Sequence, residues 1–265
     1  MNFFRCNNVA YLVFLFIFVP FIDYAIEIDI VNVRPSLFTK LKNRGLDNKE
    51  IMEIFSDERI SLYPEILEKK GKGINYMDAK FGLLSKRSIK KGKILLKEKS
   101  EILNRIQLLF GVDKEILVAI YRLETNFGSY TGRYSVFNSL LTLTLIENRR
   151  CKWAEDELVN FIILCKAHKK DLFAIKGSWA GAFGLCQFVP TAFLEHAVDG
   201  DGNGTIDLFD FNDAMASIAN YLKNHGWESG DIEKKKKAIW YYNRCNSYVK
   251  AVFLYADAIK SKRRF

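Results

Sequence analysis

The spacing of apolar residues along the chain is typical of helices. From Ser36 onward they recur three and four positions apart, and no segment shows a convincing alternation of apolar and polar residues. The first pattern fills one face of an α-helix, whereas the second would fill one face of a strand. The sequence therefore predicts a mainly α protein without β-strands. The expected helices cover 37–41, 49–55, 63–69, 88–110, 114–124, 136–147, 151–168, 191–197, 211–225 and 231–260, the last interrupted near Asn243.

One of these helices is apolar on most sides and ends next to a glutamate. Asp113 is its expected N-cap, and Glu124 follows Leu117 and Ile120 at helical spacing, so its carboxylate lies on the apolar face. Burial there raises a carboxyl pKa toward neutrality, as a general acid near pH 7 requires. Most helix glutamates are solvated surface residues, but here the polar, glycine-bordered segment 125–128 follows and opens a rim for a ligand. Glu124 is therefore the candidate catalytic residue.

Two further segments combine aromatic residues with groups that suit sugar binding. Residues 177–190 interleave three glycines with Trp179 and Phe183, a composition that favours a loop with close backbone approach and aromatic platforms. Residues 240–244 join one Trp, two Tyr, an Asn and an Arg, with Tyr248 shortly after, and could hydrogen-bond a sugar. A tight packing corner and an ordinary amphipathic helix are the respective structural alternatives.

An acidic loop starts at Asp199. Its oxygen-bearing side chains alternate along a twelve-residue span with glycine at the sharp turn, the pattern of an EF-hand calcium loop, although a solvated acidic turn has a similar composition. Oxygen ligands alone argue against zinc, and we expect Ca2+ in a structural role and no organic cofactor. The candidate ligands are Asp199, Asp201, Asn203 and Thr205, and Asp210 stands at the closing position, where Glu is usual.

Together these segments resemble a known family. Residues 124–128, residues 178–190, the acidic loop, and Tyr242 with Asn243 are similar in order and spacing to the membrane-bound lytic murein transglycosylase B family. The similarity covers roughly residues 100–259, with a looser match upstream. Several ordered motifs make the resemblance specific.

For residues 101–265 the resemblance implies a lysozyme-like helical core with a calcium loop at 199–213, preceded by a helical region at 27–100. The implied activity is that of a lytic transglycosylase on peptidoglycan. Glu124 would protonate the bond between N-acetylmuramic acid and N-acetylglucosamine and then accept the proton of the muramoyl 6-hydroxyl, giving a 1,6-anhydro product without water. The substrate-binding residues implied by position are Ser178, Gln187, Arg149, Arg150, Tyr242, Asn243 and Tyr248, and the implied closing calcium ligand is Asp213 rather than Asp210.

The lone carboxylate separates this activity from ordinary glycoside hydrolysis. Hydrolases use two acidic groups about 5 to 9.5 Å apart, whereas an intramolecular hydroxyl in place of water requires only one. Two alternatives stay open: a muramidase that hydrolyses the same bond, and a catalytically inactive, calcium-dependent wall-binding protein. Only fourteen residues separate 225–227 from Tyr242, where family members commonly carry an extra segment, so the groove length and the preference for peptide stems are also open.

Charge adds little to this interpretation. The net charge of +9 suggests an anionic partner, and the basic residues cluster at 86–99, 234–237 and 260–264. Such clusters are also typical of solvated faces, and no nucleic-acid motif accompanies them. The resemblance implies peptidoglycan strands as the partner, and we expect no nucleic acid and a monomeric chain.

The N-terminus and the cysteines indicate the cellular compartment in which the protein is expected to act. An apolar run at 9–22 follows Arg5 and is short for a membrane span, so residues 1–26 are predicted to be a signal peptide or an N-terminal anchor. The protein would then be exported to the periplasm and, with an anchor, associated with the membrane.

Free thiols and disulfides are both open for the four later cysteines. Cys151 and Cys165 cannot pair on one straight helix, where fourteen residues span about 21 Å, and Cys186 with Cys245 is a weak possibility.

Overall fold

The computed structural model describes residues 29–69, 75–78 and 80–260, and most of them are helical, which confirms the mainly α class. The predicted signal peptide or anchor at 1–26 lies outside the described residues. The helices are α2 (Ile30–Val33), α3 (Pro35–Asn43), α4 (Asn48–Phe55), α5 (Lys86–Glu98), α6 (Ser100–Phe110), α7 (Lys114–Thr125), α8 (Val136–Leu145), α9 (Cys151–Ala167), α10 (Pro190–His196), α11 (Phe211–Asn224), α12 (Ile232–Tyr242) and α13 (Asn246–Lys260).

The helix expected over 88–110 is in fact two helices, α5 and α6. They meet at Lys99, whose φ of −103° and ψ of 22° depart from helical values. The apolar period continues across the junction without glycine or proline, so the sequence contains no signal for the break. The end of α6 is as expected, because Gly111 takes the left-handed conformation with φ 72°.

Three other local predictions were wrong. Residues 63–69 contain only a 3-10 turn at Pro64–Ile66. A two-stranded antiparallel sheet pairs β1 (Tyr134–Ser135) with β2 (Lys176–Gly177), although no strand was expected. Strands of two residues are too short to produce an alternating pattern. Asp113 occupies the N-cap position of α7 without capping it through its side chain, and its carboxylate instead pairs with the Lys235 ammonium at 2.6 Å.

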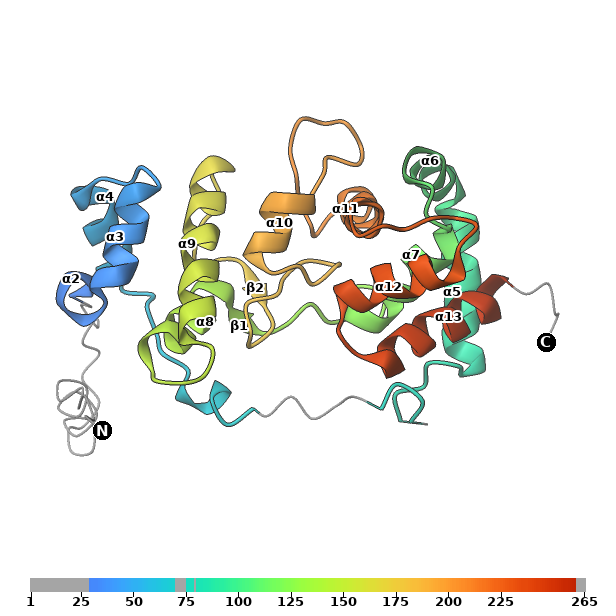
Figure 1. Cartoon of the computed structure of the whole chain (residues 1–265), viewed down its shortest axis with the longest axis horizontal. Coiled ribbons are helices and arrows are strands. Elements are labelled where there is room, and N and C mark those ends of the chain that lie inside the picture. Colours follow the sequence, from blue (N-terminus) through green and yellow to red (C-terminus); the bar gives the residue numbers. More distant parts are fainter. Residues whose placement is uncertain (1–28, 70–74, 79, 261–265) are drawn as a thin grey trace.

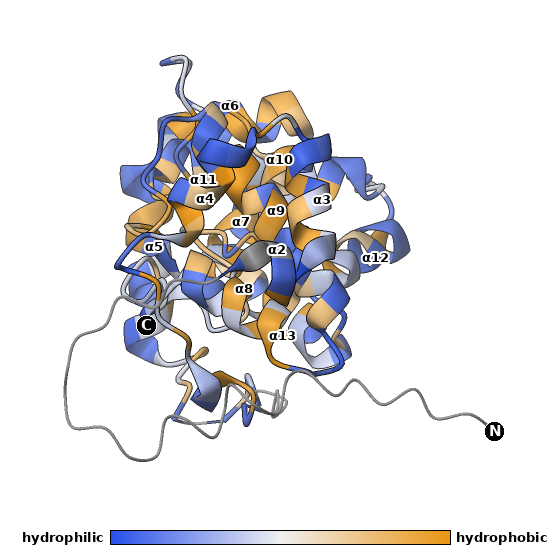
Figure 2. Ribbon diagram, turned by 90° about the vertical axis from the view of Figure 1, so that its left-hand side faces the viewer, coloured by the Kyte–Doolittle hydropathy of each residue, from blue (hydrophilic) through white to orange (hydrophobic). Residues whose placement is uncertain are grey.

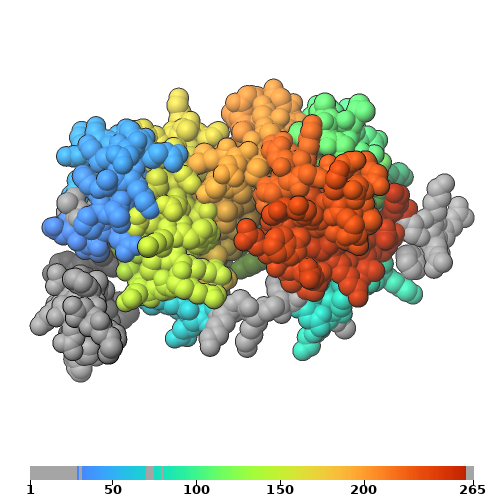
Figure 3. Space-filling view, viewed as in Figure 1, coloured from blue at the N-terminus to red at the C-terminus, as the bar shows by residue number. Residues whose placement is uncertain are grey.

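The helices form two groups joined in the middle of the molecule (Figure 1). In one group α7 packs against α13, α5, α11 and α6. In the other, α9 packs against α8 and α3. Helix α10 contacts both α9 and α11 and so connects the groups, and the short sheet lies near it. Figure 3 shows the N-terminal helices, the α8–α9 pair and the C-terminal helices following one another along the long axis.

One hydrophobic core runs through both groups, from Leu37 on α3 to Ile259 on α13. Figure 2 shows apolar residues concentrated inside the helical body, whereas α12 at its edge is mostly hydrophilic. The N-terminal helices join this core through apolar side chains and are also held by a buried charge: the Glu155 carboxylate on α9 accepts from Arg34 Nε at 2.7 Å and pairs with Lys40 Nζ at 2.8 Å. Among the described helices, none is both long and apolar enough to cross a bilayer.

Candidate active site

Glu124 lies near the C-terminal end of helix α7, which is buried along most of its length. All side chains from Ile116 to Leu123 are buried, so this helix passes through the core. It stops at Thr125 because Asn126 and Phe127 turn into the left-handed region, with φ of 51° and 61°. Gly128 follows with φ 74°, and a Cβ there would lie 2.7 Å from the Tyr121 hydroxyl, so only glycine fits.

The Glu124 carboxyl group is partly buried and holds one hydrogen bond. Tyr248 Oη donates to Glu124 Oε1 at 2.6 Å, and no other hydrogen bond to this carboxylate occurs within the described residues. Burial raises the pKa of Glu124 to about 7, while the Tyr248 hydroxyl acts in the opposite direction. A large share of the group is therefore protonated at neutral pH. None of the influences on this pKa comes from a second carboxylate in the described part of the chain.

Tyr248 is fixed by other aromatic rings. It is 1% exposed and stacks on Tyr242, with ring centroids 6.4 Å apart and planes 6° from parallel. Tyr242 Oη donates to the Cys186 carbonyl oxygen at 2.5 Å, which ties this stack to the loop before α10. Tyr76 packs edge-on against Tyr248 at 5.5 Å, and burial raises the pKa of the Tyr76 hydroxyl. These contacts fix the direction from which Tyr248 reaches the carboxylate.

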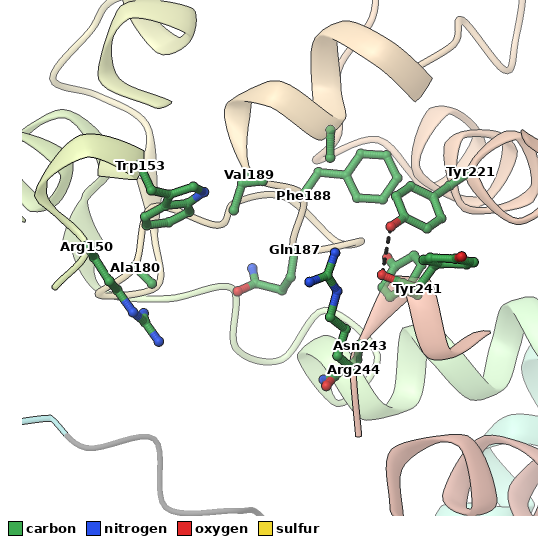
Figure 4. Close-up of a pocket in the computed structure, with 12 residues that line it drawn as sticks. Arg150, Trp153, Ala180, Gln187, Phe188, Val189, Tyr221, Tyr241, Asn243 and Arg244 are labelled. Atoms are coloured by element: carbon green, nitrogen blue, oxygen red, sulfur yellow. Dashed lines mark hydrogen bonds between the residues drawn. The ribbon is translucent and has the colours of Figure 1, made fainter. Parts of the chain in front are cut away.

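A cavity of about 640 Å³ opens beside this stack (Figure 4). Arg150 and Trp153 lie on the α9 side, and Tyr221 and Tyr241 lie on the opposite side, where Tyr221 Oη donates to the Tyr241 carbonyl oxygen at 2.9 Å. Glu124 is not among the lining residues; the connection is Tyr242, which lines the cavity and stacks on the ring that holds the carboxylate. The full lining is Arg150, Trp153, Ala180, Gln187, Phe188, Val189, Ala192, Tyr221, Tyr241, Tyr242, Asn243 and Arg244.

Gln187 presents one free acceptor to this cavity. Its Nε2 donates to the Thr131 and Gly184 carbonyl oxygens, both at 2.9 Å, so the amide nitrogen is fully used and Oε1 remains available. The residue has a φ of 52°, because the chain reverses sharply between Phe183 and Phe188, which exchange two backbone hydrogen bonds. A Cβ on Gly184 would lie 2.4 Å from Leu208 Cβ. The glycines of this loop thus serve tight packing as well as the site.

The structure brings together most of the predicted substrate-binding residues. Arg150, Gln187, Tyr242 and Asn243 line the same cavity, and Tyr248 lies outside the lining but contacts Glu124. Ser178 and Arg149 also lie outside the lining. Ser178 Oγ accepts from the Ala180 and Ala182 backbone amides at 3.3 and 3.0 Å, and Arg149 is exposed beside Arg150.

Sequence reasoning missed Tyr76, Trp153 and Tyr221. Trp153 and Tyr221 stand at ordinary helical positions on α9 and α11, where an aromatic residue looks like core. Tyr76 precedes α5 in a stretch without helical periodicity or a motif, and nothing near it in the sequence points to residue 248. Only the tertiary fold reveals these three residues.

Three carboxylates of the acidic loop come together. Oxygens of Asp199, Asp201 and Asp213 lie within 4.8 Å of one another. Asp213 is fully buried, and its two oxygens accept from the Gly200 and Asp207 backbone amides, each at 2.7 Å. Asp210 instead caps α11, accepting from Asn212 N at 2.6 Å. This oxygen-only set fits a hard cation such as Ca2+. Asn203 and Thr205 lie in the same loop and hydrogen-bond each other through their side chains at 2.6 Å.

The four cysteines of the described chain are free thiols. Cys151 and Cys165 both lie on α9, as expected. Cys186 is fully buried, and Cys245 Sγ lies 3.0 Å from Ser247 Oγ. Within the described residues, no disulfide links Cys186 in the loop before α10 to Cys245 between α12 and α13.

Comparison with known proteins gives consistent matches. The transglycosylase SLT domain family matches residues 35–235. Membrane-bound lytic murein transglycosylase B of Escherichia coli (strain K12) is 30% identical over 211 residues, which are 76% of this chain and 58% of that protein, so the chain spans little more than half of this relative.

Solved structures share the fold. Soluble lytic transglycosylase SltB1 of Pseudomonas aeruginosa aligns with a TM-score of 0.79 and 26% identity, over 86% of this chain and 98% of that one. Escherichia coli lytic transglycosylase Slt35, in complex with calcium, gives 0.78 and 24%, over 88% and 94%. Pseudomonas aeruginosa SltB3, in complex with NAG-anhNAM-pentapeptide, gives 0.75 and 25%, over 87% and 79%.

Proposed function

Because the chain belongs to the transglycosylase SLT domain family, we propose that it is a lytic transglycosylase that cleaves the glycan strands of peptidoglycan. The observation that carries this proposal is the Glu124 carboxyl group, whose pKa is raised to about 7 by burial next to a cavity lined by aromatic rings and amides. A side chain that is neutral in part of the population near pH 7 can donate a proton and later accept one.

Glu124 acts twice in the proposed reaction. Its protonated carboxyl gives a proton to the glycosidic oxygen as the bond between that oxygen and C1 of the muramoyl residue breaks. The resulting carboxylate then takes the proton of the muramoyl 6-hydroxyl as O6 bonds to C1. The products are a new 4-hydroxyl and a 1,6-anhydro ring, no water is consumed, and Glu124 ends protonated. Tyr248 holds Oε1 throughout, which leaves Oε2 for the transfers.

The solitary carboxylate favours this route over hydrolysis. An inverting or retaining hydrolase needs a second acidic group about 5 to 9.5 Å from the first. Among the described residues, no aspartate or glutamate lines the cavity, and the hydrogen-bond partner of the Glu124 carboxylate is a tyrosine. An intramolecular hydroxyl removes the need for a base that activates water.

The cavity supplies the proposed sugar contacts. Trp153 and Tyr241 offer apolar ring faces, and Gln187 Oε1 and the Asn243 amide offer hydrogen-bonding groups. Arg150 would meet carboxylate or carbonyl groups of the substrate, and Ser178 and Arg149 would act from the rim. Binding of a muramoyl pentapeptide compound by the relative SltB3 supports such a substrate.

Calcium is proposed as a structural ion in the acidic loop. Asp199, Asp201 and Asp213 would hold it, with Asn203 and Thr205 as further oxygen donors. The complex of Slt35 with calcium supports this assignment. Because Asp213 stands at the start of α11, the ion would fix the helix that carries Tyr221 into the cavity.

The proposed place of action is the cell wall. Residues 1–26 would export the chain or anchor it in the membrane, in line with the membrane-bound name of the Escherichia coli relative. This assignment places the enzyme next to its polymer.

A charge-neutral substitution tests the role of Glu124. Purified sacculi are incubated with the protein and with its Glu124→Gln variant, and soluble muropeptides are quantified. We expect the variant to lose release by at least about a hundredfold, the usual contribution of a general acid. Glu101→Gln, at an exposed position of α6, is the matched control and should retain full activity. A folded Glu124→Gln protein that releases muropeptides at the original rate would refute the proposal.

A further inference from the structure

The cavity contains two guanidinium groups and no acid. Among its twelve lining residues, Arg150 and Arg244 are charged, and both are cationic. Arg150 lies over the Trp179 ring, with Cζ 5.1 Å from the centroid. Arg244 follows α12, and Figure 4 shows its guanidinium between Gln187 and the tyrosine side of the cavity. The cavity is therefore electropositive.

Arg244, like Arg150 and Lys237, has no ionic partner in the described part of the chain. Three of the four lysines on α12 are each paired with a carboxylate, whereas the Arg244 guanidinium makes no ion pair or hydrogen bond within the described residues. It lies over the Trp240 ring, 5.7 Å from the centroid, and its charge acts on the Tyr221 hydroxyl, lowering the pKa of that group against the larger effect of burial. The lysine pairs are Lys234–Glu228, Lys235–Asp113 and Lys236–Glu233.

An unpaired guanidinium facing a binding cavity selects a particular ligand chemistry. Its planar fork matches the two oxygens of a carboxylate, and the pair is strong when solvent is partly excluded. Peptidoglycan offers carboxylates on the lactyl side of muramic acid. They belong either to the peptide stem or, after the stem has been removed, to the lactyl group itself. Both sources present the same group to the cavity.

We infer that Arg244 is a specificity residue that recognises a carboxylate on the lactyl side of the muramoyl residue. The inference rests on the proposed function and adds to it the substrate feature that this enzyme selects. Arg244 lies at the cavity wall formed after α12, so it contributes to binding and takes no part in the proton transfers at Glu124.

The test measures binding separately from catalysis. The full chain carrying Glu124→Gln is titrated calorimetrically with four ligands. Two carry the carboxylate: a disaccharide tetrapeptide, and a disaccharide whose lactyl group is free. Two lack it: the disaccharide tetrapeptide with all of its carboxyl groups converted to methyl esters, and a neutral N-acetylglucosamine tetramer.

Adding Arg244→Gln should weaken the binding affinity for the carboxylate ligand that Arg244 contacts about tenfold, the size expected for one charge-assisted pair. The affinities for the two ligands without the carboxylate should stay within about twofold. The ligand that loses affinity identifies the source of the carboxylate. Arg87→Gln, exposed on α5 and absent from the cavity lining, is the matched control and should bind all four ligands unchanged.

Two outcomes would overturn the inference, and they are distinguishable. If Arg244→Gln weakens the binding of the esterified ligand and of the free acid equally, or weakens the binding of neither, Arg244 does not recognise the carboxylate. The proposed activity is unaffected by that result. If the Glu124→Gln protein binds none of the four ligands, the proposed function falls with the inference. Thermal unfolding of each variant confirms that the exposed substitution leaves the fold intact.

Discussion

Two opposing influences set the pKa of the Glu124 carboxyl group. Burial at the end of α7 raises its pKa to about 7, and the Tyr248 hydroxyl lowers it. The first influence follows from the apolar positions that precede Glu124 in the sequence. The second comes from a residue 124 positions away, which local periodicity cannot locate. The local sequence therefore predicts the raised pKa of Glu124 but not the hydrogen bond that lowers it.

The pH dependence of cleavage should show both influences. Activity requires the protonated carboxyl, so kcat/KM should fall as the pH rises through about 7. Tyr248→Phe removes the hydrogen bond that lowers the pKa, so the falling limb should move to higher pH, measured as the rate of clearing of sacculi across the pH range. Tyr63→Phe, in the separate cluster around Tyr134, should leave the limb in place. A limb that moves to lower pH in Tyr248→Phe would contradict this account.

The same carboxyl should make stability depend on pH. Its folded pKa of about 7 lies above the ordinary value of 4.5, so the folded state binds the proton more tightly than the unfolded chain. The resulting stabilisation is complete below pH 4.5 and is lost as the pH rises through about 7.

Glu124→Gln carries no such group. Relative to the original protein, it should gain up to about 3 kcal/mol of unfolding free energy between pH 5 and pH 9. Urea denaturation at both pH values measures this change. An equal difference between the two proteins at both values would show that the carboxyl is not buried as described.

Among the elements, the long periodic helices could be predicted and the short or irregular ones could not. The break between α12 and α13 near Asn243 and the end of α7 after Glu124 follow from polar and glycine-rich residues. The break at Lys99 has no such residue, and β1 and β2 are too short for a pattern. The acidic loop was recognisable because its oxygen donors alternate, and that spacing alone put Asp210 at the closing position, whereas the family resemblance indicated Asp213. In the fold, Asp213 is buried beside Asp199 and Asp201, and Asp210 caps α11.

The loop before α11 should respond to calcium. Adding Ca2+ to chelator-treated protein should stabilise the fold by about 3 kcal/mol at a hundredfold excess over Kd and raise Tm by a few degrees. Asp201→Asn, at an exposed position of the cluster, should lose most of this shift, and Asp257→Asn, exposed on α13, should retain it. Identical melting curves with calcium and with chelator would refute the assigned ion.

At the scale of the whole molecule, two helical groups create the site between them. The α7 group provides Glu124 and Tyr248, the α9 side provides Arg150 and Trp153, and α10 connects the groups. The mainly α class follows from periodicity, and the lysozyme-like arrangement from ordered motifs. The convergence of Tyr76, Trp153 and Tyr221 depends on packing between distant helices, which no short pattern encodes.

The origin of the oxygen atom at the new chain end tests the central claim most directly. Sacculi are digested in water enriched in oxygen-18, and the released muropeptides are analysed by mass spectrometry. The account predicts 1,6-anhydromuramoyl ends without the heavy isotope, because O6 of the same sugar displaces the leaving group. Reducing ends that carry oxygen-18 would show that water is the nucleophile and that Glu124 serves a hydrolase.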